Sequence, residues 1–309
     1  MQVVTLIARL ADGAWHRVDD MKETCRQLEA LGLDAEVMED RCRLAYPLDL
    51  LDQAAIATLL PPGVELDVAA VVDSTNTRLA QRPPPPVGTT SVLAAEFQYG
   101  GRGRLQRKWV SPYASGVCLS LAQQLEPPPD MPAALSLVTG VATLRALREL
   151  AVTGVGLKWP NDIVWRGAKL GGVLLEASTT AAGLHVVTGI GINVRLPGAA
   201  AEVIAGDGGI EATDLHAIDP ALCLRRNELT AALVSHTRAA LTQFASDGFA
   251  PFREQWNDAD VLNGSAVSVS GADTITGVAG GINESGALVV RSGNMTHHLV
   301  AGDVRVRET

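Results

Sequence analysis

Apolar positions recur at helical spacing twice within the first sixty residues. An apolar run over residues 3–10 stops at an Asp-Gly pair, and residues 20–31 place apolar side chains at every third or fourth position before Gly32. Residues 34–44 then alternate loosely between apolar and polar, as in a short hairpin or wing. The pattern predicts two small helices and a hairpin in residues 1–60.

From about residue 65 the pattern changes to short β-branched runs separated by turn residues, which is typical of strands. These runs are 68–72, 91–95, 116–121, 154–157, 163–165, 172–175 and 185–194. Residues 131–150, with Asp130 as a candidate N-cap, and residues 220–246, which stop at an Asp-Gly pair, have the long apolar faces of buried helices. Strands with only two such helices predict a mixed sheet with helices packed against it, an α+β layer fold.

The composition shifts again after Trp256, to short alternating stretches between glycines and asparagines. The stretches are 266–270, 275–278, 287–291, 298–300 and 304–306. Five short strands in about fifty residues predict a small β-barrel. The chain is thus predicted to divide into a helical segment (1–60), a central domain (61–258) and a C-terminal barrel (259–309).

Composition and charge narrow the class of protein. The 309 residues are 47% hydrophobic and 19% charged, as in an ordinary globular chain, and no apolar run approaches the roughly 18 residues that span a bilayer. The N-terminus lacks a basic region and meets Arg9 too early for a signal peptide, and the four cysteines lack the spacing of a zinc site or disulfide framework. We therefore expect a cytoplasmic protein. A net charge of −9 argues against a protein that mainly coats nucleic acid.

One segment departs from this acidic background. Residues 100–109, GGRGRLQRKW, hold three glycines and four cations in ten positions. Glycines let a backbone close around a ligand, and clustered cations with free N–H groups attract anions. A solvated charged loop is the alternative, but it needs neither the interleaved glycines nor Trp109. The spacing is neither that of a dinucleotide fingerprint nor that of a P-loop, so the segment predicts a phosphate-binding loop of another class.

Three further segments carry candidate chemistry. In residues 158–162, KWPND, the proline forces a corner that holds the Asn-Asp pair, whether for a ligand or only as a turn. Residues 169–176, KLGGVLLE, bring Lys169 to a glycine pair that permits close ligand approach. In residues 189–194, GIGINV, Asn193 is the single polar residue of an apolar strand, and it must find partners in the protein or in a ligand.

Together and in this order, the four segments resemble the fingerprints of the biotin protein ligases, GRGRxGRxW, KWPND, KLxGxLxE and GxGINV. Residues 73–76, DSTN, match a further element of that family, and the resemblance covers about residues 65–305. Gln106 stands where the family usually has glycine, which we expect to alter the loop's flexibility more than its chemistry. The resemblance implies the class II synthetase-like catalytic fold that biotin and lipoate ligases share, with an SH3-like C-terminal barrel.

The resemblance also implies an activity: biotin and ATP form biotinyl-5′-AMP, and biotin then passes to one lysine of a biotin carboxyl carrier protein, with Mg²⁺ sharing the charge. The implied catalytic residues are Arg104, Lys169 and Asp162. The implied biotin-binding residues are Ser74, Thr75, Asn76, Gln98, Arg102, Gly103, Arg104, Lys169 and Gly172. The implied ATP-binding residues are Arg102, Arg104, Arg107, Trp109, Asn161, Asp162, Asn193 and Arg307. Asp162 is a candidate metal contact, or the acceptor of the incoming lysine's proton, and Arg307 has an alternative reading as a solvated terminal arginine.

Some relatives also repress transcription through an N-terminal winged helix, and residues 6–13, 28–33 and 46–51 resemble parts of that domain. Between these parts roughly ten residues are missing from the DNA-reading element. Residues 1–60 also hold 6 Lys+Arg against 11 Asp+Glu, whereas a groove-reading domain should be basic. We expect a degenerate winged helix retained for packing, without specific DNA binding. A bifunctional ligase and repressor and a lipoate ligase remain as alternatives, and relatives suggest ligand-dependent pairing into a homodimer.

Overall fold

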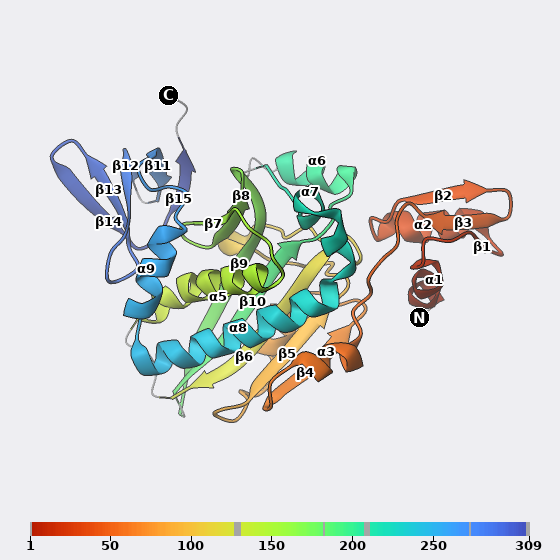
Figure 1. Cartoon of the computed structure of the whole chain (residues 1–309), viewed down its shortest axis with the longest axis horizontal. Helices are drawn as coiled ribbons and strands as arrows, with labels where there is room; N and C mark the ends of the chain where they lie inside the picture. The colour runs from red at the N-terminus through yellow and green to blue at the C-terminus, as the bar shows by residue number, and fades with distance from the viewer. Residues whose placement is uncertain (1, 127–130, 182, 207–210, 272, 307–309) are drawn as a thin grey trace.

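A computed structural model describes residues 2–126, 131–181, 183–206, 211–271 and 273–306. Three sheets follow one another along the chain, with three, seven and five strands. In Figure 1 the N-terminal sheet (orange-red) and the C-terminal sheet (blue) lie on opposite sides of the central one. Within the described residues, no helix is both long and apolar enough to cross a membrane.

The N-terminal part contains two helices and a small antiparallel sheet. Its elements are α1 (Gln2–Leu10), β1 (His16–Arg17), α2 (Met21–Ala30), β2 (Ala35–Met38) and β3 (Arg41–Leu44). α2 begins where the Asp20 carboxylate accepts a hydrogen bond from the N–H of Glu23. The sequence pattern predicted both helices and the hairpin, and a single helix lies between β1 and β2.

This part shares an apolar core with the central part. Leu10 and Leu28 are fully buried in a cluster that includes Tyr113 and Ala114, which precede β6 (Gly116–Leu125) in the chain. The N–H of Tyr113 donates to the carbonyl of Leu31 at 2.9 Å. The N-terminal part therefore covers the loop before β6. Burial of apolar surface between the two favours this packing.

The central sheet is mixed, as predicted. Its strands are β4 (Val64–Ala69), β5 (Thr90–Ala95), β6 (Gly116–Leu125), β7 (Val155–Lys158), β8 (Asp162–Trp165), β9 (Ala168–Thr180) and β10 (Gly183–Asn193). They are ordered β4-β5-β6-β10-β9-β8-β7, and only β4 and β5 pair in parallel among them.

Two long helices, α5 (Leu135–Glu149) and α8 (Arg226–Asp247), cover one face of this sheet (Figure 1). Val186, Ile190 and Ile192, at alternate positions of β10, join the core with them, while the intervening residues face the other side. α8 ends at Gly248, whose φ of 71° few other residues adopt. α5 begins only after a 3₁₀ turn over Pro132–Ala134. The candidate N-cap Asp130 lies outside the described residues.

The shorter helices did not show in the hydrophobic pattern. They are α3 (Gln53–Leu59), α4 (Thr75–Ala80), α6 (Gly198–Gly206), α7 (Leu215–Ile218) and α9 (Ala250–Asp258). Two or three turns of helix are marginal on their own, so caps and tertiary packing decide whether they form.

The C-terminal part contains the five predicted strands. They are β11 (Ala266–Ser270), β12 (Thr274–Ile282), β13 (Leu288–Ser292), β14 (Met295–Leu299) and β15 (Asp303–Val306). They form one antiparallel sheet in the order β14-β13-β12-β11-β15, consistent with an SH3-like domain.

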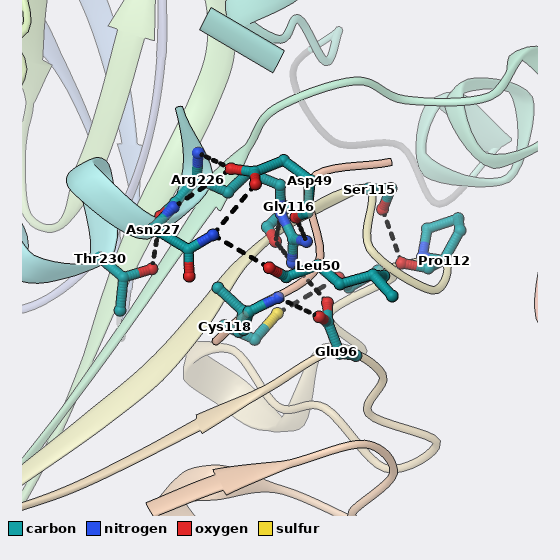
Figure 2. Close-up of polar contacts among 12 residues, drawn as sticks. Asp49, Leu50, Glu96, Pro112, Ser115, Gly116, Cys118, Arg226, Asn227 and Thr230 are labelled. Carbon is teal, nitrogen blue, oxygen red and sulfur yellow. Dashed lines mark hydrogen bonds and ion pairs between the residues drawn. The ribbon is translucent and has the colours of Figure 1, made fainter. Parts of the chain in front are cut away.

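A buried ionic junction joins the linker after the N-terminal part to the central sheet (Figure 2). The side chains of Arg226 and Glu96 are 1% and 5% exposed, and their charged atoms lie 2.7 Å apart. The Arg226 guanidinium also donates to the carbonyls of Gly116, at 2.9 Å, and Asp49. The Asp49 carboxylate accepts from the backbone N–H of Arg226 at 2.7 Å and from the amide of Asn227 at 3.0 Å. The start of α8 thus fixes the linker and the start of β6.

Candidate active site

A cavity of about 920 Å³ lies where the central sheet meets the last strand of the C-terminal sheet. Its walls come from the N-terminus of α4, residues 100–109 (here the glycine-arginine loop), β8 to β10, and residues 302–306. The predicted site residues that line it are Ser74, Thr75, Asn76, Gln98, Arg102, Gly103, Arg104, Arg107, Trp109, Asn161, Asp162, Lys169, Gly172 and Asn193. Arg307 lies outside the described residues. Segments more than two hundred residues apart in sequence therefore meet at one cavity.

The N-terminus of α4 forms one wall of this cavity. The Ser74 hydroxyl caps the helix by accepting from the N–H of Thr77. Gln98 Oε1 accepts from both the N–H of Thr75, at 2.8 Å, and its hydroxyl, at 3.1 Å. The buried hydroxyl of Ser120 is within hydrogen-bond distance of Thr75 Oγ1, at 2.7 Å. These contacts hold Thr75 and Gln98 in place at the cavity.

Both amide atoms of Asn76 form hydrogen bonds with other residues of the protein. Its Oδ1 accepts from Ser120 at 2.6 Å, and its Nδ2 donates to Glu176 at 3.0 Å and to the carbonyl of Leu174 at 3.3 Å. A Cβ at Gly189 would lie 2.4 Å from Asn76 Oδ1, so a glycine is needed there. Asn76 shapes the wall in this structure, and its predicted contact with biotin stays a prediction.

The glycine-arginine loop folds back on itself as a narrow hairpin. The N–H of Gly103 donates to the carbonyl of Arg107 at 2.7 Å, and the N–H of Trp109 donates to that of Gly101 at 2.9 Å. Gln106 has a φ of 60°, in the left-handed region. This conformation is easy for glycine but costs about 1 kcal/mol for other residues. The departure from the family pattern therefore adds strain at the tip of the loop.

Trp109 packs its indole onto the strand that carries the GIGINV motif. A Cβ at Gly191 would lie 2.5 Å from Trp109 Cζ2, so only glycine leaves room for the ring. The indole Nε1 is buried and has no hydrogen-bond partner among the described residues. The glycine spacing of the motif is thus explained in part by packing of this ring.

The cavity is strongly cationic within an acidic protein. Its cationic lining residues are Arg102, Arg104, Arg107, Lys108, Lys158, Lys169 and Arg305, against the two carboxylates Asp162 and Asp303. Burial lowers the pKa of Lys158, with the nearby carboxylates opposing the shift, and burial also lowers the pKa of Arg104. Such a surplus of positive charge in a partly desolvated cavity suits a ligand with several negative charges.

The two carboxylates of the lining each hold one of the cations. Lys169 Nζ forms an ion pair with Asp162. Arg107 Nη2 lies 2.6 Å from Asp303, which connects the glycine-arginine loop to β15. Burial alone would raise the pKa of Asp303, but the hydrogen bond and charge of Arg107, together with the charges of Lys158 and Arg305, outweigh it and lower the pKa.

Two asparagines predicted for the nucleotide side make backbone contacts. Asn161 Nδ2 donates to the carbonyl of Val173 at 2.7 Å, and Asn193 Nδ2 donates to that of Thr213 at 3.0 Å. For Asn193, where the sequence left structural and ligand roles open, the structure provides the structural partner. Both side chains nonetheless line the cavity.

The residues of the cavity fit a magnesium ion that arrives with a nucleotide. The described residues contain no group of three or more His, Cys, Asp or Glu that could hold a metal. Mg²⁺ bound with phosphates needs only one or two protein carboxylates, because water and phosphate supply the remaining ligands. Asp162 and Asp303 both line the cavity, and either carboxylate could serve.

Several residues of the site were not predicted. They are Ser120, Lys158, Glu176, Asp303 and Arg305. Lys158 and Glu176 stand inside recognised motifs, which was a usable signal. Asp303 and Arg305 belong to a separate sheet, and no local pattern indicates that β15 reaches the cavity.

This fold and this cavity fit a ligase that joins a small carboxylic acid to a nucleotide. Residues 68–193 match the Biotin/lipoate A/B protein ligase family, and residues 264–307 match the Biotin protein ligase C terminal domain. The chain is 31% identical to the bifunctional ligase/repressor BirA of Escherichia coli (strain K12), over 98% of this chain and 96% of that one. It is 32% identical to the biotin–[acetyl-CoA-carboxylase] ligase of Mycobacterium tuberculosis, over 86% and 98%.

A solved structure agrees with these relatives. The biotin protein ligase from Aquifex aeolicus in complex with biotin and ATP superposes with a TM-score of 0.64 at 27% identity, covering 79% of this chain and 99% of that one. The chain belongs to the biotin protein ligase family. It is therefore a ligase that acts on biotin with ATP.

Proposed function

We propose that this enzyme forms biotinyl-5′-AMP from biotin and ATP and then transfers biotin to one lysine of a biotin carboxyl carrier protein. The proposal rests on one observation: the four motif segments meet at one cavity. Its lining includes residues of the glycine-arginine loop and of the KWPND, KLGG and GIGIN segments. Its surplus of cations suits the carboxylate of biotin and the phosphates of ATP.

In the first step an oxygen of biotin's carboxylate attacks the α-phosphorus of ATP, and the bond from that phosphorus to pyrophosphate breaks. Two anions must meet while charge builds on the leaving group. Arg104, Arg107 and Lys169 would stabilise that charge from the cavity wall. Asp162 would hold the Mg²⁺, which supplies further positive charge when bound.

The remaining predicted residues divide between the two substrates. On the biotin side, Thr75 and Gln98 are held in place by their mutual hydrogen bonds, with Ser74 and Asn76 shaping the wall. Arg102 and Gly103, with Arg104 and Lys169, would surround the carboxylate and phosphate. Gly172 would let the strand backbone approach the ureido group of biotin. On the nucleotide side, Trp109 would stack near the adenine, with Asn161 and Asn193 beside it and Arg307 reaching the phosphates.

In the second step the neutral amine of the carrier lysine attacks the acyl carbon, an amide forms and AMP leaves. A free lysine has a pKa near 10.4 and is mostly protonated at neutral pH, so a base must take its proton. We assign that base to Asp162, which lines the cavity beside Lys169.

Biotin-dependent exchange of pyrophosphate into ATP tests the first step. We expect Lys169→Ala and Arg104→Ala to slow the exchange by at least roughly tenfold, because each removes a cation from the cavity. Lys22→Ala, on the exposed face of α2, serves as the control for loss of a positive charge. Wild-type exchange and wild-type retention of the adenylate in both cavity mutants would overturn the assignment.

A second candidate function is transcriptional repression. Its support is the Escherichia coli bifunctional ligase/repressor, which aligns over nearly its whole length, and the three-stranded sheet beside α2. Against it stands the acidic balance of residues 1–60. We propose that this segment serves packing, with residues 61–258 as the catalytic domain and 259–309 as the C-terminal domain. A gel shift with biotin and ATP present decides: salt-sensitive binding to a specific operator would reject this proposal.

Pairing of two chains is a further proposal, tested by sedimentation with and without biotin and ATP. We expect a mass increase toward a dimer when both ligands are present. A monomer under all conditions would reject it.

A further inference from the structure

Arg226 joins the two ends of a chain segment that lines the cavity (Figure 2). Its guanidinium lies 2.7 Å from the carboxylate of Glu96, just after β5, and donates to the carbonyl of Gly116, the first residue of β6, at 2.9 Å. Residues 97–115, between these two contacts, contain Gln98 and the whole glycine-arginine loop. Both contacts lie outside that loop, so one side chain of α8 anchors the segment at its base.

The contact with Arg226 lies where the ladder between β5 and β6 ends. The last pair of that ladder is Ala95 with Cys118. On the side of β4 the chain continues to pair, because the carbonyl of Val72 accepts from the N–H of Tyr99 at 3.1 Å. On the side of β6 the buried ion pair stands just past the last pair of the ladder and holds the chain there.

Gln98 lies two residues beyond Glu96, at the wall of the cavity. Its Oε1 accepts from the N–H of Thr75 at 2.8 Å and from the hydroxyl of Thr75 at 3.1 Å. The Glu96 carboxylate is fixed on both oxygens, since one accepts from the arginine and the other from the N–H of Leu51. A fixed Glu96 leaves Gln98, and with it Thr75, little freedom to move away from the cavity.

The ionic character of the contact indicates a role other than stability. The two charged side chains are 1% and 5% exposed, so both charges are desolvated. A buried ion pair is often no more stabilising than apolar side chains of similar volume. The planar fork of a guanidinium, however, carries five donors, and here it reaches Glu96, Gly116 and Asp49 together. Apolar side chains would fill the same space without fixing these three positions.

We propose that Arg226 and Glu96 are positioning residues for the biotin side of the cavity. Together they set the place of Gln98, which in turn holds Thr75. This proposal rests on the proposed function, in which Gln98 and Thr75 lie beside biotin. Neither charged side chain belongs to the described lining of the cavity, so neither acts on the reacting atoms. Loss of the pair therefore weakens biotin binding more than it slows the chemical step.

Hydrogen exchange of the ligand-free protein tests the positioning without reference to biotin. The first variant combines Arg226→Met with Glu96→Leu, which leaves no unpaired charge in the core. We expect the N–H groups of Thr75 and Tyr99 to exchange roughly tenfold faster than in the wild type, because the segment that holds both is no longer fixed. The amides of β9, two strands away from β6, should exchange as in the wild type.

Arg226→Lys tests the same contact with a smaller change. Lysine keeps a positive charge opposite Glu96, so the fold should persist. Its single ammonium lacks the fork that also reaches the carbonyl of Gly116. We expect faster exchange at Thr75 and Tyr99 in this variant too, by roughly threefold to tenfold.

Arg238→Met is the matched control. This arginine also belongs to α8 and also donates to backbone carbonyls, those of Pro62 and Gly88, but these precede β4 and β5 at the opposite end of the strands. The control should leave exchange at Thr75 and Tyr99 unchanged. Wild-type exchange at both amides in both Arg226 variants would overturn the proposal. An equal rise throughout β9 would overturn it as well, because it would show a general loss of stability.

Steady-state kinetics then separate positioning from damage to the chemistry. We expect Arg226→Lys to raise the KM for biotin by roughly fivefold to tenfold while kcat changes less than about twofold, and Arg238→Met to leave both unchanged. A fall in kcat with an unchanged KM for biotin would contradict a positioning role. If wild-type protein fails to use biotin at all, the proposed function falls, whereas hydrogen exchange still tests whether the ion pair positions Gln98 and Thr75.

Discussion

Replacing Arg226 by methionine should be among the most destabilising single changes outside the cavity. The guanidinium is 1% exposed, and its removal leaves the buried Glu96 carboxylate without its counter-charge. The carbonyls of Gly116 and Asp49 lose their donors as well. Breaking a buried pair from one side costs about 3–5 kcal/mol, because the remaining charge stays buried.

Urea unfolding, followed by circular dichroism, measures this loss as a difference in unfolding free energy. Arg225→Met is the matched control, because the side chain of Arg225 is 38% exposed and its ion pair among the described residues is with Glu228, a contact worth less than about 1 kcal/mol. Adding Glu96→Leu to Arg226→Met should recover part of the stability, since no unpaired charge then remains. A difference between the two arginine variants of less than about 1 kcal/mol would show that the buried pair of Arg226 and Glu96 does not stabilise the fold.

Three further changes test other parts of the structure. Burial raises the pKa of Asp260 to about 6. The unfolded carboxyl ionises near pH 4, so the folded state binds more protons between pH 4 and 6, and stability is lost as the pH rises through this window. Wild type should therefore lose stability relative to Asp260→Asn, and the difference in unfolding free energy between the two should grow by about 2–3 kcal/mol in favour of the variant from pH 4 to pH 7. A difference that does not change with pH would contradict the raised pKa of Asp260. Gly191→Ala should cost about 1–3 kcal/mol in urea unfolding, because its methyl group would overlap Trp109, and an unchanged midpoint would contradict the contact. Asp303→Asn should raise the KM for ATP roughly threefold to tenfold and also lower kcat, because it releases Arg107; unaltered values of both would exclude a role for this ion pair.

Much of the fold was predictable because its elements carry strong local signals. The strands of both larger sheets alternate or run β-branched between turn residues, and α8 ends at a glycine that its backbone angle requires. The short helices α3, α4 and α9 lacked such a signal, because six to nine residues depend on caps and neighbours. Ser74, a cap that was recognised only as part of a motif, begins one of them.

The residues of the site could likewise be predicted only where a local motif indicated them. Motif residues such as Arg104 and Lys169 could be selected from the sequence, and the structure brings them to one cavity. Local sequence could not reveal contacts between distant segments, such as that of Arg107 with Asp303, which are 196 positions apart. Nor could it show that the amide group of Asn76 is hydrogen-bonded to Ser120 and Glu176.

Mass measurement of a carrier domain tests whether this enzyme attaches biotin to protein. The domain is incubated with this enzyme, ATP, Mg²⁺ and either biotin or lipoate. We expect the mass of one biotinyl group on one lysine, with no gain when ATP is left out or when lipoate replaces biotin. A gain with lipoate alone, or none with biotin, would contradict it.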